Sequence, residues 1–209
     1  KANYKVHAHN DYAQEFPFWE AYIGGASSIE VDVFLKEKTL FVTHSENEIK
    51  KPNTLEKLYL QPLKQLQTEG RLRSLQLLID IKSDAEATLK AITKAIEKQN
   101  LDEVEGLHFV ISGNRPEAKA YSEYPDFIHV DIIDSSMHKE ASDTNLHQLN
   151  VVKAYWPNHK IHTHIMSKFP SKWLNKAIEY SDIIYFHLDC SEDIKVLSNR
   201  IKSHNKIPG

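Results

Sequence analysis

Short runs of β-branched and aromatic residues alternate with helical patterns along almost the whole chain of 209 residues. Nine runs have the composition of strands, because they are rich in Val, Ile, Phe or Tyr and are bounded by polar or turn residues. They are Tyr4 to His9, Ser28 to Leu35, Leu40 to His44, Leu75 to Lys82, Leu107 to Ser112, Phe127 to Ile132, Val151 to Trp156, Lys160 to Met166 and Asp182 to Leu188.

Helical patterns follow several of these runs. One begins at Thr54, carries leucines at helical spacing and ends at Gly70. Another is expected to start with a capping box made by Ser83 and Glu86. Two more are expected after Pro170 and after Ser191. Repeated strand–helix units predict a parallel sheet covered by helices.

We therefore expect an α/β protein, a compact (β/α)8 TIM barrel in one domain that covers residues 1–209. The chain is shorter than the roughly 250 residues typical of this barrel. Between Trp156 and Lys160 there is no room for a crossover helix, since a parallel connection needs about a dozen residues. Either one βα unit is degenerate or one of the two flanking strands is wrongly assigned.

Composition excludes several classes of function. The six glycines form neither a dinucleotide-binding G-x-G-x-x-G motif nor a P-loop, and the single Cys190 excludes a disulfide framework. A net charge of −3 without a basic block argues against nucleic acid as a partner. No apolar run approaches the roughly 18 residues that cross a bilayer. Because the chain begins with Lys1 and not Met, we expect a secreted or periplasmic protein whose signal peptide has been removed.

Carboxylates recur on one face of two strand-like runs. Glu30 and Asp32 lie two residues apart, so they share a face, as do Asp80 and Lys82 in the later run. Apolar residues occupy the other face of both runs. Charges within such apolar runs need a partner or a ligand, because burying a bare charge costs several kcal/mol. The less favoured alternative is a half-exposed strand for the first run and a surface Asp–Lys pair for the second.

Three carboxylates on neighbouring strands suit a hard divalent cation such as Mg²⁺ or Ca²⁺ and suit zinc poorly. Lys82 would then provide a fixed positive charge for an anionic substrate. Among the 12 histidines, His9 and His44 end two of the strand-like runs. Two histidines beside a metal can act as acid and base, and a positioned proton-transfer group contributes about 10²–10⁴ in rate.

These segments resemble a known family when taken together. His9 to Tyr12, Pro17-Phe18, Ser28 to Leu35, Leu40 to His44, Leu78 to Lys82 and Ser112 to Pro116 are similar to the glycerophosphodiester phosphodiesterase-like branch of the phosphatidylinositol-phospholipase-C-like phosphodiesterases. The resemblance covers slightly over half of the chain. The ordered combination of the motifs on successive strands is specific, whereas any one motif by itself is not.

The resemblance implies a (β/α)8 barrel that cleaves phosphodiesters with a bound divalent cation. It implies that the metal ligands are Glu30, Asp32 and Asp80, and that His9 and His44 are the catalytic acid–base pair. Lys82 would contact the phosphate, and Asn10 takes the substrate-binding position at which those enzymes carry an arginine. Relatives use a neighbouring hydroxyl of the substrate as nucleophile and pass through a cyclic phosphate.

The substrate is expected to be a small-molecule or lipid-derived phosphodiester. Only 35 residues separate His44 from Asp80, too few for the insertion that shapes the glycerol pocket in those enzymes. The oligomeric state stays open.

Two other hypotheses remain. His7 and His9 share a face, and this H-x-H pair could bind zinc or manganese with His162, His164 or His187, as in amidohydrolase-like barrels. The strand with Glu30 and Asp32 argues against that hypothesis, because oxygen donors dominate the matched site. The third hypothesis is a non-catalytic barrel that binds a phosphorylated or glycan ligand, although a binding module has no need for both His9 and His44.

Overall fold

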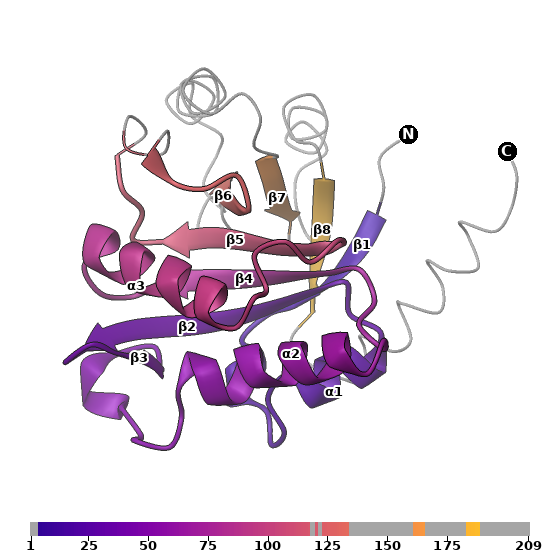
Figure 1. The fold of residues 1–209 in the computed structure, drawn as a ribbon, viewed down its shortest axis with the longest axis horizontal. Helices are drawn as coiled ribbons and strands as arrows, with labels where there is room; N and C mark the ends of the chain where they lie inside the picture. Colours follow the sequence, from indigo (N-terminus) through magenta and orange to yellow (C-terminus); the bar gives the residue numbers. More distant parts are fainter. Residues whose placement is uncertain (1–3, 118–119, 121–122, 134–160, 166–182, 189–209) are drawn as a thin grey trace, which may run out of the picture.

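The computed structural model describes residues 4–117, 120, 123–133, 161–165 and 183–188. Eight strands form one sheet in this part of the chain, in the order β1-β8-β7-β6-β5-β4-β2-β3, with a further pairing of β1 with β2 (Figure 1). Their bounds are β1 Tyr4–Ala8, β2 Ser28–Lys36, β3 Thr39–Val42, β4 Leu75–Ile81, β5 Leu107–Gly113, β6 Ile128–Ile133, β7 Ile161–Ile165 and β8 Ile183–Leu188. They correspond to eight of the nine predicted strands, while Val151 to Trp156 lies outside the described residues.

The sheet closes on itself through its first strand. Strand β1 pairs in parallel with β8 along its whole length, from Tyr4↔Ile184 to Ala8↔Leu188. On its other edge it pairs in parallel with the start of β2, at His7↔Ser28 and Ala8↔Ile29. Since all the other pairings except β2 with β3 are parallel, the described strands confirm an α/β fold with a parallel sheet.

Three α-helices cover the first half of the sheet: α1 Trp19–Gly24, α2 Gln61–Thr68 and α3 Ala85–Lys98 (Figure 1). A π-helical segment, η3 Glu56–Leu60, leads directly into α2, and the 3-10 turns η1 Asp11–Ala13 and η2 Glu46–Glu48 lie in loops. The short α1 was not predicted from the sequence. Within the described residues, no helix combines the length and apolar character needed to cross a bilayer.

The core forms where these helices meet the outward residues of the strands. Alternate residues of β2 and β4 are fully buried and apolar, and they pack with the apolar stripes of α2 and α3 in one cluster. The cluster includes Ile29, Val31 and Val33 of β2, Leu77, Ile79 and Ile81 of β4, Leu63 and Leu66 of α2, and Leu89, Ile92 and Ile96 of α3. The polar residues that alternate with them lie on the opposite face of the sheet, away from the helices.

Two helix starts that were predicted from the sequence lie in the described region, and they differ in how well the prediction holds. At the earlier one, Thr54 Oγ1 accepts from the backbone N–H of Lys57 at 3.2 Å, as expected. The predicted capping box of Ser83 with Glu86 is wrong. The N-cap of α3 is Asp84, which accepts from Ala87 N at 2.8 Å, whereas the Ser83 hydroxyl accepts from Leu35 N and so ties the end of β2 to the β4–α3 loop. The helices expected after Pro170 and Ser191 lie outside the described residues.

Candidate active site

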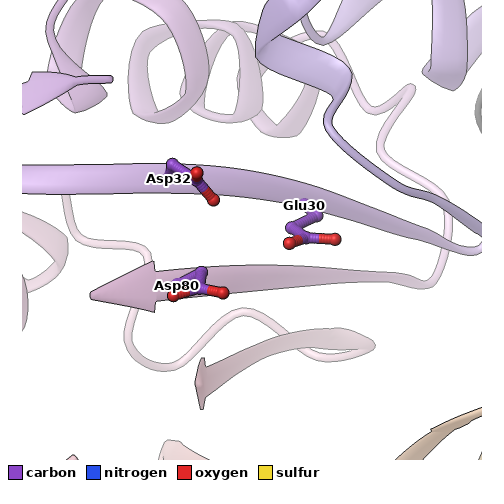
Figure 2. Close-up of side chains that lie close together, drawn as sticks. All are labelled: Glu30, Asp32 and Asp80. Carbon is purple, nitrogen blue, oxygen red and sulfur yellow. The ribbon is translucent and has the colours of Figure 1, made fainter. Parts of the chain in front are cut away.

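Three carboxylates converge where β2 and β4 lie side by side, as Figure 2 shows. Glu30 and Asp32 are alternate residues of β2, and Asp80 is the direct register partner of Asp32 on β4. One oxygen from each of the three carboxylates lies within 4.8 Å of the others. Within the described residues, this is the group of acidic, histidine and cysteine side chains whose geometry could hold a metal ion.

The two oxygens of Asp32 have different surroundings. Its Oδ2 accepts hydrogen bonds from the Tyr12 hydroxyl at 2.8 Å and from Nδ1 of His44 at 2.7 Å, and Lys82 Nζ lies 3.5 Å away. Its Oδ1 is buried and accepts no hydrogen bond. A buried polar atom without a partner costs about 1–3 kcal/mol, so this oxygen suits a ligand. An all-oxygen set with a buried, unsatisfied carboxylate oxygen fits a hard divalent cation.

His44 reaches Asp32 because of a tight hairpin. Glu37 and Lys38, both with left-handed backbone at φ values of 49° and 68°, form the two-residue turn between β2 and the antiparallel β3. Past the end of β3, Thr43 N still donates to Asp32 O at 3.1 Å, which places the next side chain over the Asp32 carboxylate. The side chain of His44 is 65% exposed, and with Nδ1 donating to Asp32 a neutral ring presents Nε2 as an acceptor.

The loop after β1 brings the second predicted histidine to the other end of the cluster. His9 Nε2 lies 3.8 Å from Glu30 Oε2. Asn10 follows with left-handed backbone at a φ of 50°, and its carbonyl accepts from Ala13 N to begin η1. Tyr12 then extends from η1 to Asp32. Burial, followed by the charge of Asp32, raises the pKa of Tyr12, so its hydroxyl keeps its proton and donates.

Lys82 pairs with the carboxylate that lies nearest to it on β4. Its Nζ is 3.1 Å from Asp80 Oδ1. Burial lowers the pKa of Lys82, but the charges of Asp80 and Asp32 outweigh this effect and the net shift is upward. Burial raises the pKa of Asp80 to about 6, against the opposing effect of Lys82. One ammonium therefore faces three carboxylate groups, so the electrostatics of the cluster still favour the binding of further positive charge.

A glycine makes space for Asp80. Gly113, the last residue of β5, has a φ of +70°, and a Cβ at this position would overlap Asp80 Oδ1. It would also lie 2.5 Å from the carbonyl oxygen of Ile81. The sequence contains Gly113 within the motif Ser112 to Pro116, but its spacing did not indicate this role.

Asp11, which sequence reasoning missed, anchors the loop that carries His9 and Tyr12. It is 1% exposed, and its Oδ2 accepts from Phe18 N at 2.6 Å and from the Tyr59 hydroxyl at 2.8 Å. These bonds join the loop to the start of α1 and to η3. Burial raises the pKa of Asp11 to about 6, against the two hydrogen bonds, and Glu20 adds to the rise.

Replacing Asp11 with Asn is expected to make stability less dependent on pH. The folded pKa of about 6 exceeds the ordinary 3.8, so this group stabilises the fold below about pH 4 and the contribution is lost as pH rises through 6. The rise corresponds to about 3 kcal/mol. Urea unfolding at pH 4 and pH 7 should therefore show Asp11→Asn gaining about 2 kcal/mol over the natural protein between the two pH values, since at pH 4 the unfolded carboxyl is already partly ionised. An equal difference at both pH values would contradict the argument.

The H-x-H pair does not converge on a metal position. His7 is fully buried, with Nδ1 bonded to Ser28 Oγ at 2.7 Å and Nε2 to Glu30 Oε2 at 3.0 Å. The three later histidines lie in strands of the same sheet. His162 and His164 lie in β7, and His187 lies in β8 in register with His7.

Comparison with known proteins finds a family model that matches the N-terminal part of the chain. Residues 2–72 match the family model of the AIM6-like phosphodiesterase domain, a stretch that contains His9, Glu30, Asp32 and His44. The predicted resemblance to a phosphodiesterase family is thereby confirmed for this part of the chain. Residues 108–209 match the model of the Ribulose-phosphate 3 epimerase family.

The relatives are named as follows. Altered inheritance of mitochondria protein 6 homolog of Arthroderma benhamiae is 34% identical over 117 residues, which are 44% of this chain and 37% of that protein. Altered inheritance of mitochondria protein 6 of Kluyveromyces lactis is 27% identical over 82% of this chain and 51% of that protein. The chain thus spans about a third to a half of the length of these relatives. A crystal structure of glycerophosphodiester phosphodiesterase from Agrobacterium tumefaciens aligns with a TM-score of 0.47 and 14% identity, covering 96% of this chain and 100% of that one.

Proposed function

We propose that the protein is a metal-dependent phosphodiesterase, built on a (β/α)8 barrel, that cleaves a glycerophosphodiester or a lipid-derived phosphodiester. The observation that supports it is the convergence of Glu30, Asp32 and Asp80. Two histidines and a lysine lie against this cluster, each in contact with one or two of its carboxylates. The match of residues 2–72 to a phosphodiesterase-like domain supports the same class of reaction.

In this proposal Glu30, Asp32 and Asp80 hold the divalent cation, Mg²⁺ or Ca²⁺. The cation would polarise the phosphoryl oxygens and offset the negative charge that develops on them. Lys82 binds the same phosphoryl group from beside Asp80, where its ammonium is held by the two aspartates. Asn10 follows His9 in the loop after β1 and contacts the substrate in this proposal.

His9 and His44 move the protons. One takes the proton from the attacking hydroxyl of the substrate, and the other gives a proton to the leaving alkoxide. Asp32 orients His44 by accepting a hydrogen bond from its Nδ1–H, so Nε2 of His44 is the nitrogen that exchanges a proton with the substrate. Tyr12 holds the same Asp32 oxygen and so keeps this arrangement in place.

A panel of glycerophosphodiesters, lysophospholipids and bis-aryl phosphates, followed by ³¹P NMR, tests the proposal. Cleavage is expected with Mg²⁺ or Ca²⁺, and EDTA should abolish it reversibly. His9→Ala should lower kcat by about 10²–10⁴-fold while cation affinity stays unchanged, since His9 is a proton-transfer group and not a ligand here. The absence of cleavage across the panel would defeat the proposal. Activity that survives EDTA or His9→Ala would defeat the assigned roles.

A further inference from the structure

A row of buried polar side chains lies next to the carboxylate cluster and has no part in the proposed reaction. Gln76 on β4, Ser28 on β2 and His7 on β1 are register neighbours on adjacent strands. All three are 0% exposed. Gln76 Nε2 donates to Ser28 Oγ at 2.7 Å, and Ser28 Oγ lies 2.7 Å from Nδ1 of His7. The row ends at Glu30, whose Oε2 is 3.0 Å from Nε2 of His7.

The chemistry of Glu30 determines which atom of each pair in this row donates the hydrogen bond. An ionised carboxylate only accepts hydrogen bonds, so Nε2 of His7 must carry a proton to bond Glu30. In the neutral ring Nδ1 is then an acceptor, which the Ser28 hydroxyl satisfies. The Ser28 oxygen in turn accepts from the amide of Gln76. Both ring nitrogens of His7 and the Ser28 hydroxyl thereby have hydrogen-bond partners, which offsets the cost of burying them.

We propose that His7 is a positioning residue: it holds the Glu30 carboxylate in the orientation that binds the cation, and Ser28 and Gln76 fix the ring of His7. This inference rests on the proposed cation site. A neutral donor orients Glu30 without cancelling its charge, in contrast to Asp80, whose oxygen faces the ammonium of Lys82. Outer hydrogen-bond partners of this kind commonly set how strongly a metal is held.

The first experiment is ¹⁵N NMR on protein labelled in its histidine rings, without cation or substrate. The His7 signals are assigned by their loss in His7→Leu. A proton on Nε2 of His7 is expected in the natural protein, and in Ser28→Ala the Nδ1 signal should shift because this nitrogen loses its donor. A His7 ring without a proton on Nε2 would overturn the inference.

The second experiment is calorimetric titration with Mg²⁺ and Ca²⁺. His7→Leu removes the donor to Glu30 and should weaken binding by about 10–100-fold. His7→Gln places an amide N–H close to the position of Nε2 and should keep most of the affinity. Unchanged affinity in His7→Leu would overturn the inference. An equal loss in both variants would also overturn it, because the ring itself and not its donated proton would then be required.

A matched control separates positioning from general stability. Thr93→Val removes a buried hydroxyl that donates to Leu89 O at 3.0 Å within α3, away from the carboxylates. It should lower the unfolding temperature without altering cation affinity. Both experiments are read without substrate, so a failure to cleave any phosphodiester counts against the proposed function and leaves the role of His7 standing. Cleavage together with a cation affinity that does not depend on His7 would support the proposed function and overturn the role of His7.

Discussion

Asp32→Asn is expected to weaken Mg²⁺ and Ca²⁺ binding by at least about 100-fold and phosphodiester cleavage by about 10³-fold. The substitution removes a charge, and it replaces one acceptor with a donor. Oδ2 of Asp32 accepts hydrogen bonds from Tyr12 and His44 and lies 3.5 Å from the ammonium of Lys82, a third donor group, whereas the buried Oδ1 has no hydrogen bond. If the amide oxygen faces the three donors, its NH₂ faces the cation. If the amide is reversed, the NH₂ meets the three donors.

Calorimetric titration for the cation and ³¹P NMR for cleavage measure the two effects of Asp32→Asn separately. Asp84→Asn is the matched control, since Asp84 caps α3 and Asn is an equally good N-cap. The control should retain both cation affinity and cleavage. Cation affinity that is the same in Asp32→Asn as in the natural protein would remove Asp32 from the ligand set.

Gly113→Ala is expected to cost roughly 3 kcal/mol of stability and about 10²-fold in cleavage. Its left-handed backbone alone costs about 1–2 kcal/mol with a side chain, and an overfilled position commonly adds about 1–3 kcal/mol. The new methyl group would overlap Asp80 Oδ1 and lie 2.9 Å from Ile81 N, so the carboxylate must move. A displacement of about 1 Å in a catalytic site can cost about 10²-fold in rate.

Gly70→Ala separates the two contributions to that result. Gly70 also has left-handed backbone, at a φ of +64°, but no atom lies within 4 Å of a Cβ placed there. This variant should lose about 1–2 kcal/mol of stability in denaturant unfolding and retain full cleavage. Equal cleavage by the two variants would show that Gly113 serves the backbone and not Asp80.

The carboxylate cluster could be predicted because it obeys the two-residue period of strands. Glu30 and Asp32 alternate with residues that are fully buried in the core, and Asp80 repeats that pattern on the neighbouring strand. Once the sheet is parallel, the register of β2 with β4 brings the three together. Most strand and helix positions among the described residues were predictable for the same reason, because burial enforces the periods.

The residues that sequence reasoning missed make contacts that the period of a strand or helix does not predict. Asp11 and Tyr12 lie in a 3-10 turn, and their partners Tyr59 and Asp32 are far away in the sequence. His7 was recognised only as one half of an H-x-H pair, since its donation to Glu30 depends on how two strands pair. Ser83 was misassigned by one residue, because Ser and Asp both cap helices and tertiary contact with Leu35 decided between them.

The closure of the sheet through β1 links the site to the far end of the chain. Strand β1 leads directly into the loop of His9, yet it has five register partners on β8 and only two on β2. Removal of β8 would leave one edge of β1 without its main neighbour, and the position of His9 would then be less well fixed. None of the proposed catalytic residues or metal ligands lies in β8 itself. A truncation that removes Ile183–Leu188 should therefore weaken the site, although these residues lie far from Asp80 in sequence.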